Sequence, residues 1–132
     1  MTKTILFVCQ GNAIRSIIAE AVFNKLCKKD YKAKSAGTIH VSKVKPKTKK
    51  VLQEINLPLT KKKPSPLTYS KINSAKKVIL MNGNIPNFPK LAPKRLIIKW
   101  NILDPVGMPI EEFRKVRNKI ILEVKKLIKK LR

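Results

Sequence analysis

The residues best suited to chemistry are a cysteine, an arginine and a serine that follow one short apolar run. Residues 5–16 read ILFVCQGNAIRS, so Cys9 ends the apolar run and Arg15 and Ser16 follow a short glycine-containing segment. A cysteine thiolate is a nucleophile, and the planar guanidinium of an arginine can hold two phosphate oxygens at once. A serine hydroxyl can donate a hydrogen bond to the sulfur. The pattern predicts a phosphate-binding loop with a thiolate at its base.

The sequence on either side of this segment indicates which elements hold it. Residues 5–8 are all apolar, which is typical of a strand buried on both faces of a parallel sheet. After Ser16, apolar residues recur at helical spacing at positions 17, 18, 21, 22 and 26. A loop from the carboxyl end of a strand to the amino end of a helix gathers free N–H groups at the positive end of the helix dipole. We therefore expect an anion site here.

Within this loop we expect Cys9 to exist largely as thiolate, because a helix N-terminus and an arginine lie beside it. Gly11 and Asn12 are residue types that tolerate a positive φ and let the backbone close tightly. The predicted phosphate-binding residues are Gln10, Gly11, Asn12, Ala13, Ile14 and Arg15. The alternative interpretation of Cys9 alone is a small buried apolar residue at a strand end.

The loop resembles the signature of the low-molecular-weight protein tyrosine phosphatase superfamily, which includes the thioredoxin-coupled arsenate reductases. The likeness covers nearly the whole chain. Residues 35–38 (SAGT) resemble a quartet of the family, and Asp104-Pro105 stands where the family keeps its general acid. Residues 46–55 and 109–120 are similar to members of the arsenate-reductase branch. Cys9, Arg15 and Asp104 are thus the expected catalytic residues.

The resemblance implies two-step phosphoryl transfer through a phosphocysteine on Cys9, with Asp104 as general acid and then general base. Without the loop, Asp104-Pro105 would be interpreted as a turn. The only other aspartate is Asp30, in a helix-end turn. We expect Ser16 to support the sulfur and Ser35 to hydrogen-bond Asn12. We expect no cofactor and no metal, and we interpret His40, the only histidine, as a loop residue.

The sequence departs from the family at its cysteines. Reductase members use two further redox cysteines, expected near residues 81–86, where this chain has none. The second cysteine, Cys27, should lie roughly 16 Å along the helix after the loop, whereas a disulfide to Cys9 requires Cα atoms within about 7 Å. Many phosphatase members also carry a cysteine beside the arginine, where this chain has Ile14.

These features favour a phosphomonoester hydrolase of the protein-tyrosine-phosphatase type. An arsenate reductase that uses an external thiol remains an alternative, and a non-catalytic phosphate or polyanion binder is a second one. Val106 and Gly107 stand where phosphatase members often place aromatic residues. The sequence therefore leaves open whether phosphotyrosine or another oxyanion is the substrate.

Composition bounds the remaining expectations. The length of 132 residues predicts one domain spanning residues 1–132. Lysine and arginine number 31 against 7 acidic residues, giving a net charge of +24. The lysines are dispersed, which favours a solvated surface, although such a charge also attracts anionic substrates and polyanions. No apolar run is long enough for a membrane span or a signal peptide, and two cysteines suit a reducing cytoplasm. Oligomeric state stays open.

Hydrophobic patterning predicts alternating elements. Strands are expected at 3–8, 32–36, 78–81 and 96–98, and helices at 16–28, 46–55, 68–75 and 110–131. Such alternation predicts an α/β fold, a single four-stranded parallel sheet with helices on both faces. Ligands of these folds bind at the carboxyl ends of the strands, where the cysteine loop and Asp104 would both lie.

Overall fold

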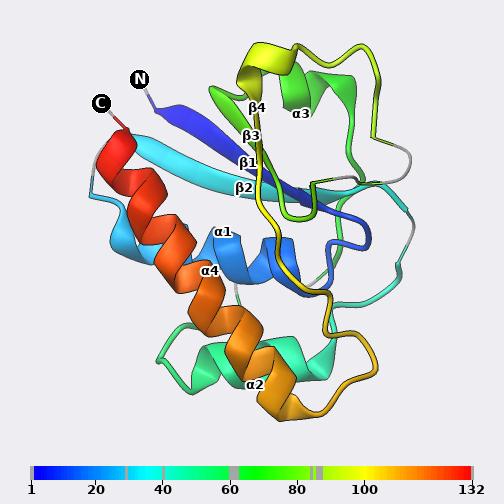
Figure 1. Ribbon diagram of the computed structural model, residues 1–132, viewed down its shortest axis with the longest axis vertical. Helices are drawn as coiled ribbons and strands as arrows, with labels where there is room; N and C mark the ends of the chain where they lie inside the picture. Colours follow the sequence, from blue (N-terminus) through cyan, green and yellow to red (C-terminus); the bar gives the residue numbers. More distant parts are fainter. Residues whose placement is uncertain are drawn as a thin grey trace.

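The computed structural model describes residues 2–28, 30–39, 41–59, 63–83, 85 and 88–131. Its strands are β1 (Lys3–Cys9), β2 (Tyr31–Gly37), β3 (Lys77–Leu80) and β4 (Ile97–Lys99). Its α-helices are α1 (Arg15–Leu26), α2 (Pro46–Gln53), α3 (Tyr69–Asn73) and α4 (Ile110–Lys130), and a 3₁₀ turn at Lys94–Leu96 precedes β4. The expected α/β order is confirmed, as Figure 1 shows.

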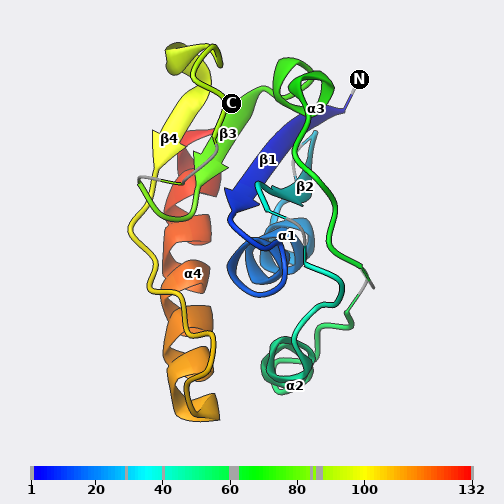
Figure 2. The ribbon, with the colours of Figure 1, turned by 90° about the vertical axis from the view of Figure 1, so that its right-hand side faces the viewer.

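The strands form one parallel sheet in the order β2-β1-β3-β4. β1 therefore has a hydrogen-bonded neighbour on each side, with Cys9 opposite Gly37 of β2 and Val8 opposite Leu80 of β3. This arrangement explains why residues 5–8 are continuously apolar, because both faces of a central parallel strand are covered. In Figure 2 the carboxyl end of β1 leads directly into the loop that enters α1.

The two faces of the sheet carry separate cores. Ile5 and Phe7 of β1 pack with apolar residues of α1, α2 and α4 on one face. Leu6 and Val8 point the other way and pack with Ile72 of α3. Because successive residues of a strand alternate between faces, β1 contributes side chains to both cores. The predicted helices on both faces are confirmed.

Helix α4 is the longest element and follows the predicted pattern. Residues at spacings of three and four face the core; those that are buried include Phe113, Val116, Ile120, Val124 and Leu127. Acidic Glu111 and Glu112 occupy its first turn and Lys129 and Lys130 its last, which suits the helix dipole. Figure 1 shows α4 beside α1, with α2 below α1 and near the lower end of α4.

Several element ends differ from the sequence-based boundaries. Helix α1 begins at Arg15 instead of Ser16 and ends at Leu26, so Cys27 is a half-buried free thiol at its C-cap. Helix α2 ends at Gln53, and Asn56 beyond it takes a positive φ of 62°, which is incompatible with a helix. The predicted cap at Thr68 is confirmed by its bond from the Lys71 N–H. No helix in the described ranges is long and apolar enough to cross a membrane.

Candidate active site

The sulfur of Cys9 lies at the end of the central strand and receives two polar contacts. Cys9 is 2% exposed. The Asn12 backbone N–H donates to its Sγ at 3.3 Å, and the Ser16 hydroxyl oxygen lies 3.0 Å away. The expected support from Ser16 is therefore present in the structure.

The side chain of Asn12 fixes the direction of the Ser16 hydroxyl bond. Asn12 Nδ2 donates to Ser16 Oγ at 2.7 Å, so that oxygen acts as an acceptor toward Asn12. The single hydroxyl proton of Ser16 is then free to point at the sulfur of Cys9. The Ser65 N–H in turn donates to Asn12 Oδ1 at 2.8 Å. A directed hydrogen-bond chain thus runs from Ser65 to the Cys9 sulfur.

The backbone of the loop presents donors on its open side. Within the described residues, the N–H groups of Gly11, Ala13 and Ile14 have no acceptor, and the N-terminus of α1 has no side-chain cap. Free N–H groups at a helix N-terminus form an anion site. Asn12 has a φ of 51°, as predicted, and this residue lies behind the loop, fully buried, with its N–H on the sulfur. The other predicted phosphate-binding residues line a cavity.

Two glycines shape the loop through close approach of the chain. Gly11 tolerates a positive φ but does not adopt one, since among the described glycines only Gly107 has a positive φ. Gly11 instead leaves space for Val41, whose Cγ2 would lie 2.9 Å from an added Cβ. At Gly37 a Cβ would lie 2.7 Å from the Gln10 carbonyl oxygen and 2.9 Å from the Asn12 nitrogen. The backbone of residues 10–12 therefore packs directly against Gly37 at the end of β2.

Arg15 and Asp104 come together from opposite ends of the chain. Arg15 is 2% exposed, and its Nη1 donates to the Ile102 carbonyl at 3.0 Å. Its Nη2 lies 3.5 Å from Oδ2 of Asp104. The other carboxylate oxygen of Asp104 accepts from the Val106 N–H at 3.1 Å, which closes a local turn. The Asp104 side chain is 38% exposed, so it can meet a solvent-accessible substrate.

These groups share one cavity of about 280 Å³. Cys9, the loop and Arg15 form part of its lining, and Asp104 lies in its wall. The remaining lining residues are Ile39, Val41, Lys45 and Val106. Among the described residues that line this cavity none is aromatic, and Val106 stands in its wall at the position where the sequence lacks the expected aromatic residue.

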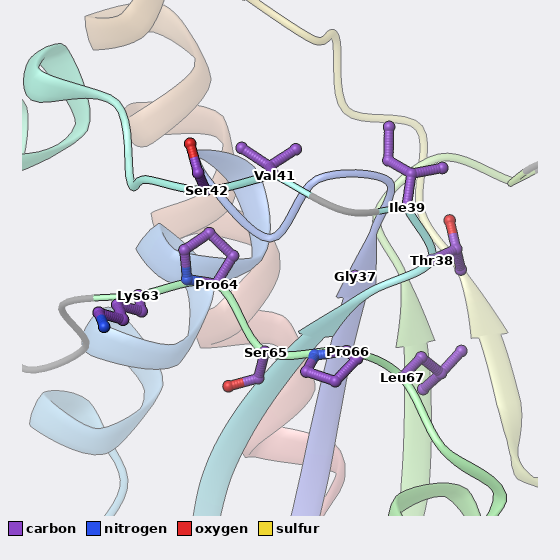
Figure 3. Close-up of a pocket in the computed structure, with 10 residues that line it drawn as sticks. All are labelled: Gly37, Thr38, Ile39, Val41, Ser42, Lys63, Pro64, Ser65, Pro66 and Leu67. Carbon is purple, nitrogen blue, oxygen red and sulfur yellow. The ribbon is translucent and has the colours of Figure 1, made fainter.

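A second hollow of about 470 Å³ adjoins this cavity. It lies between residues 37–39 and 41–42 on one side and residues 63–67 on the other, as Figure 3 shows, and we call it the side groove. Ile39 and Val41 line both the cavity and the side groove. The hydroxyl oxygen of Thr38, which also lines the side groove, is buried and has no hydrogen-bond partner among the described residues.

One predicted contact is wrong. Ser35 was expected to hydrogen-bond Asn12, but its hydroxyl donates to Glu20, and the Asn12 amide is bound by Ser16 and Ser65. The register explains this, because Ser35 pairs with Phe7, two residues before the loop begins. The prediction for His40 falls outside the described residues, and the residues that are described hold no cluster of three or more potential metal ligands.

Sequence reasoning missed several residues of the site. Gly37, Lys45, Ser65 and Ile102 contact the loop or line the cavity through pairings between distant segments. Only Gly37 carried a signal, since it belongs to the SAGT quartet. The others contribute backbone groups or a common surface residue type.

Comparison with known proteins decides the family. The family model described as low molecular weight phosphotyrosine protein phosphatase matches residues 4–132. The chain belongs to this family. The family assignment accounts for the loop, the Asp-Pro pair and the parallel sheet together, and it makes the chain a member of a family of enzymes.

Individual members of the low molecular weight phosphatase family show two kinds of activity in their names. An arsenate reductase of Bacillus cereus (strain AH187) is 30% identical over 125 residues, covering 94% of this chain and 92% of that protein. A low molecular weight protein tyrosine phosphatase from T. tengcongensis has a TM-score of 0.86 at 28% identity, covering 98% of this chain and all of that one (100%). The YwlE arginine phosphatase of Geobacillus stearothermophilus has a TM-score of 0.82 at 28% identity, covering 97% and 92%.

Proposed function

We propose that this protein hydrolyses phosphomonoesters through a phosphocysteine formed on Cys9, with Asp104 as general acid and base. One observation carries the proposal. A buried sulfur with two donors shares a cavity with Arg15, free loop N–H groups and a carboxylate. A nucleophile, an oxyanion cradle and a proton donor are the three parts that phosphoryl transfer of this type requires.

In the first step the Cys9 thiolate attacks phosphorus, and the bond from phosphorus to the leaving oxygen breaks. The loop N–H groups and Arg15 hold the three remaining phosphoryl oxygens and stabilise the charge that spreads over them. Asp104, protonated at this stage, gives its proton to the leaving oxygen. The position of Asp104 in the cavity wall, close to Arg15, supports this role.

In the second step water attacks the phosphocysteine, and Asp104 accepts a proton from it. The bond from phosphorus to sulfur breaks, inorganic phosphate leaves, and Cys9 returns as thiolate. Ser16 aids this step, because its hydroxyl proton is aimed at the sulfur on which charge reappears. Gln10, Gly11, Ala13 and Ile14 hold the phosphoryl group through backbone N–H groups in both steps.

Arsenate reduction is the second candidate, favoured by relatives that carry this name. Arsenate has the same tetrahedral shape and would occupy the same cavity. The chain contains two cysteines, and Cys27 is a free thiol at the far end of α1 from Cys9. The electrons that reduce arsenate would then come from Cys9 together with an external thiol, and the resulting mixed disulfide would be reduced by a second external thiol.

The deciding experiment is hydrolysis of para-nitrophenyl phosphate under reducing conditions. We expect turnover by the wild type, none by Cys9→Ser, and a loss of roughly two to four powers of ten in kcat for Asp104→Asn. Mass spectrometry of acid-quenched wild type should find the phosphoryl group on Cys9. A wild type without turnover refutes the proposal, and arsenate with glutathione or thioredoxin then tests the second candidate.

Two further inferences about context accompany this proposal. Since Cys9 has to stay reduced to act, we expect the protein in a reducing compartment such as the cytoplasm. The charge of +24 is expected to give salt-sensitive, non-specific binding to polyanions.

A further inference from the structure

Lys45 is a second cation in the proposed catalytic cavity, and its backbone is fixed. It lines the cavity together with Cys9 and Arg15. The Ala13 carbonyl accepts from the Lys45 N–H at 3.2 Å and from the buried Thr48 hydroxyl at 2.9 Å. Lys45 is also the N-cap residue of α2, followed by Pro46. Two bonds to one carbonyl of the phosphate loop thus hold the backbone at Lys45 against that loop.

The charges around the cavity leave Lys45 without an opposite charge. Of the described residues that line the cavity, Asp104 alone carries a carboxylate, and that carboxylate lies 3.5 Å from Arg15. Among the described residues Lys45 makes no ion pair, and its side chain is exposed. Arg15 and the loop N–H groups suffice for the phosphoryl group itself, so the charge of Lys45 is available to another part of the substrate.

The walls of the cavity indicate what kind of substrate extends beyond the phosphoryl group. Ile39, Val41 and Val106 are apolar, and Ile39 is 45% and Val106 52% exposed. An inorganic oxyanion gains nothing from such walls, whereas the carbon skeleton of an organic ester buries apolar surface against them. The side groove continues past Ile39 and Val41 and offers room for a longer chain (Figure 3).

We propose that Lys45 selects substrates with a second negative charge close to the scissile phosphate, and that these substrates are phosphorylated polypeptides with an acidic residue beside the phosphorylated one. This inference rests on the proposed phosphatase activity for its substrate class. The apolar walls receive the phosphorylated side chain, Lys45 faces the neighbouring carboxylate, and the side groove receives the continuing chain. The polypeptide is recognised by these three features together.

The test compares kcat/KM for two phosphotyrosyl peptides that differ only by Glu or Gln beside the phosphotyrosine. The wild type should prefer the Glu peptide, and Lys45→Ala should reduce this preference about two- to fivefold, the size of an exposed ion pair. Lys45→Arg should keep the preference. Lys43→Ala is the matched control, because Lys43 is exposed on the same segment and does not line the cavity. Its preference should equal that of the wild type.

Salt and binding measurements separate this inference from the catalytic proposal. The Glu preference should shrink between about 10 and 150 mM salt, as the Debye length falls from about 30 to about 8 Å. The same peptide pair, titrated against the Cys9→Ser protein with and without Lys45→Ala, gives the preference as a ratio of Kd without turnover. If the wild type shows no turnover but the ratio of the two Kd values still depends on Lys45, the catalytic proposal is refuted and the role of Lys45 is supported.

Two results would overturn the role of Lys45 while leaving the phosphatase standing. One is a Glu preference that Lys45→Ala does not change. The other is a Lys45-dependent preference for 2-carboxyphenyl phosphate over phenyl phosphate, together with no such preference between the two peptides. That result would assign the second charge to a small molecule instead of a polypeptide.

Discussion

Replacing Ser16 by alanine tests the directed hydrogen-bond chain that ends on Cys9. The Ser16 oxygen lies 3.0 Å from the sulfur and 2.7 Å from Asn12 Nδ2, and Ser16 and Asn12 are both fully buried. Water cannot easily replace the lost hydroxyl at such a site. The variant therefore removes a hydrogen bond to the sulfur, which the proposed mechanism uses as a thiolate, and nothing equivalent replaces that bond.

The expected loss of rate follows from the strength of the hydrogen bond between Ser16 and the sulfur. A hydrogen bond to a charged group contributes about 1.5–3 kcal/mol, and each 1.36 kcal/mol corresponds to about tenfold in rate. The phosphocysteine sulfur carries no full charge, and the charge returns as the bond to phosphorus breaks. Ser16→Ala should thus slow hydrolysis of the intermediate by roughly 10- to 150-fold.

Rapid-mixing kinetics with para-nitrophenyl phosphate measures this effect. Because the second step is slowed, Ser16→Ala should release a burst of para-nitrophenol that approaches one equivalent of enzyme, followed by a reduced steady-state rate. Ser74→Ala is the control, since its hydroxyl caps α3 through the Ser70 carbonyl, away from the cavity. A Ser16→Ala protein that folds normally and turns over within twofold of the wild type, without a burst, would show that the hydroxyl does not stabilise the sulfur.

Two other predictions concern the frame around the site. Gly37→Ala places a Cβ against backbone atoms of residues 10–12, so we expect about 1–3 kcal/mol of destabilisation from overpacking and at least a tenfold loss of kcat/KM. Urea unfolding measures the loss of stability, and para-nitrophenyl phosphate kinetics measures the loss of activity. Gly83→Ala is the control, because the nearest atoms to its added Cβ lie at 3.9 Å, an ordinary contact distance. Hydrogen bonds from Arg114 and secondarily from Arg117 lower the pKa of Glu54 from 4.5 to about 2. Since this pKa is depressed in the folded state, the stability that Glu54 contributes is full above about pH 4.5 and disappears toward pH 2. The stability gap between wild type and Glu54→Gln, from urea unfolding at pH 7, 5 and 3, should be constant between the first two and smaller at pH 3; a gap that persists undiminished there would contradict the assignment.

The sequence predicted the parts of this site whose determinants are local. The strand, the loop and the start of α1 are contiguous, so Cys9, Arg15 and Ser16 could be placed from spacing and periodicity alone. Asp104 came from a resemblance, and the structure brings it within 3.5 Å of Arg15. The element types were also predictable, because α4 carries a clear helical hydrophobic period and β1 a continuous apolar run.

The parts that sequence could not give depend on which distant segments meet. Ser65 and Ile102 act through backbone groups, which every residue type possesses, so their identity carries no signal. Ser35 was assigned a wrong partner because the register places it opposite Phe7, two residues before the loop, where its hydroxyl donates to Glu20. Lys45 is one of many lysines, and only its anchoring to Ala13 distinguishes it.

The central position of β1 has a consequence for motion. Its amides hydrogen-bond to neighbours on both sides, and its side chains belong to both cores. Hydrogen exchange of residues 5–8 should require opening of the whole fold, whereas Asp104 sits in an irregular segment that can open alone. A local fluctuation can therefore withdraw Asp104, the proposed proton donor, while Cys9 stays in register. The rate at which that segment closes sets a limit on how often the two meet.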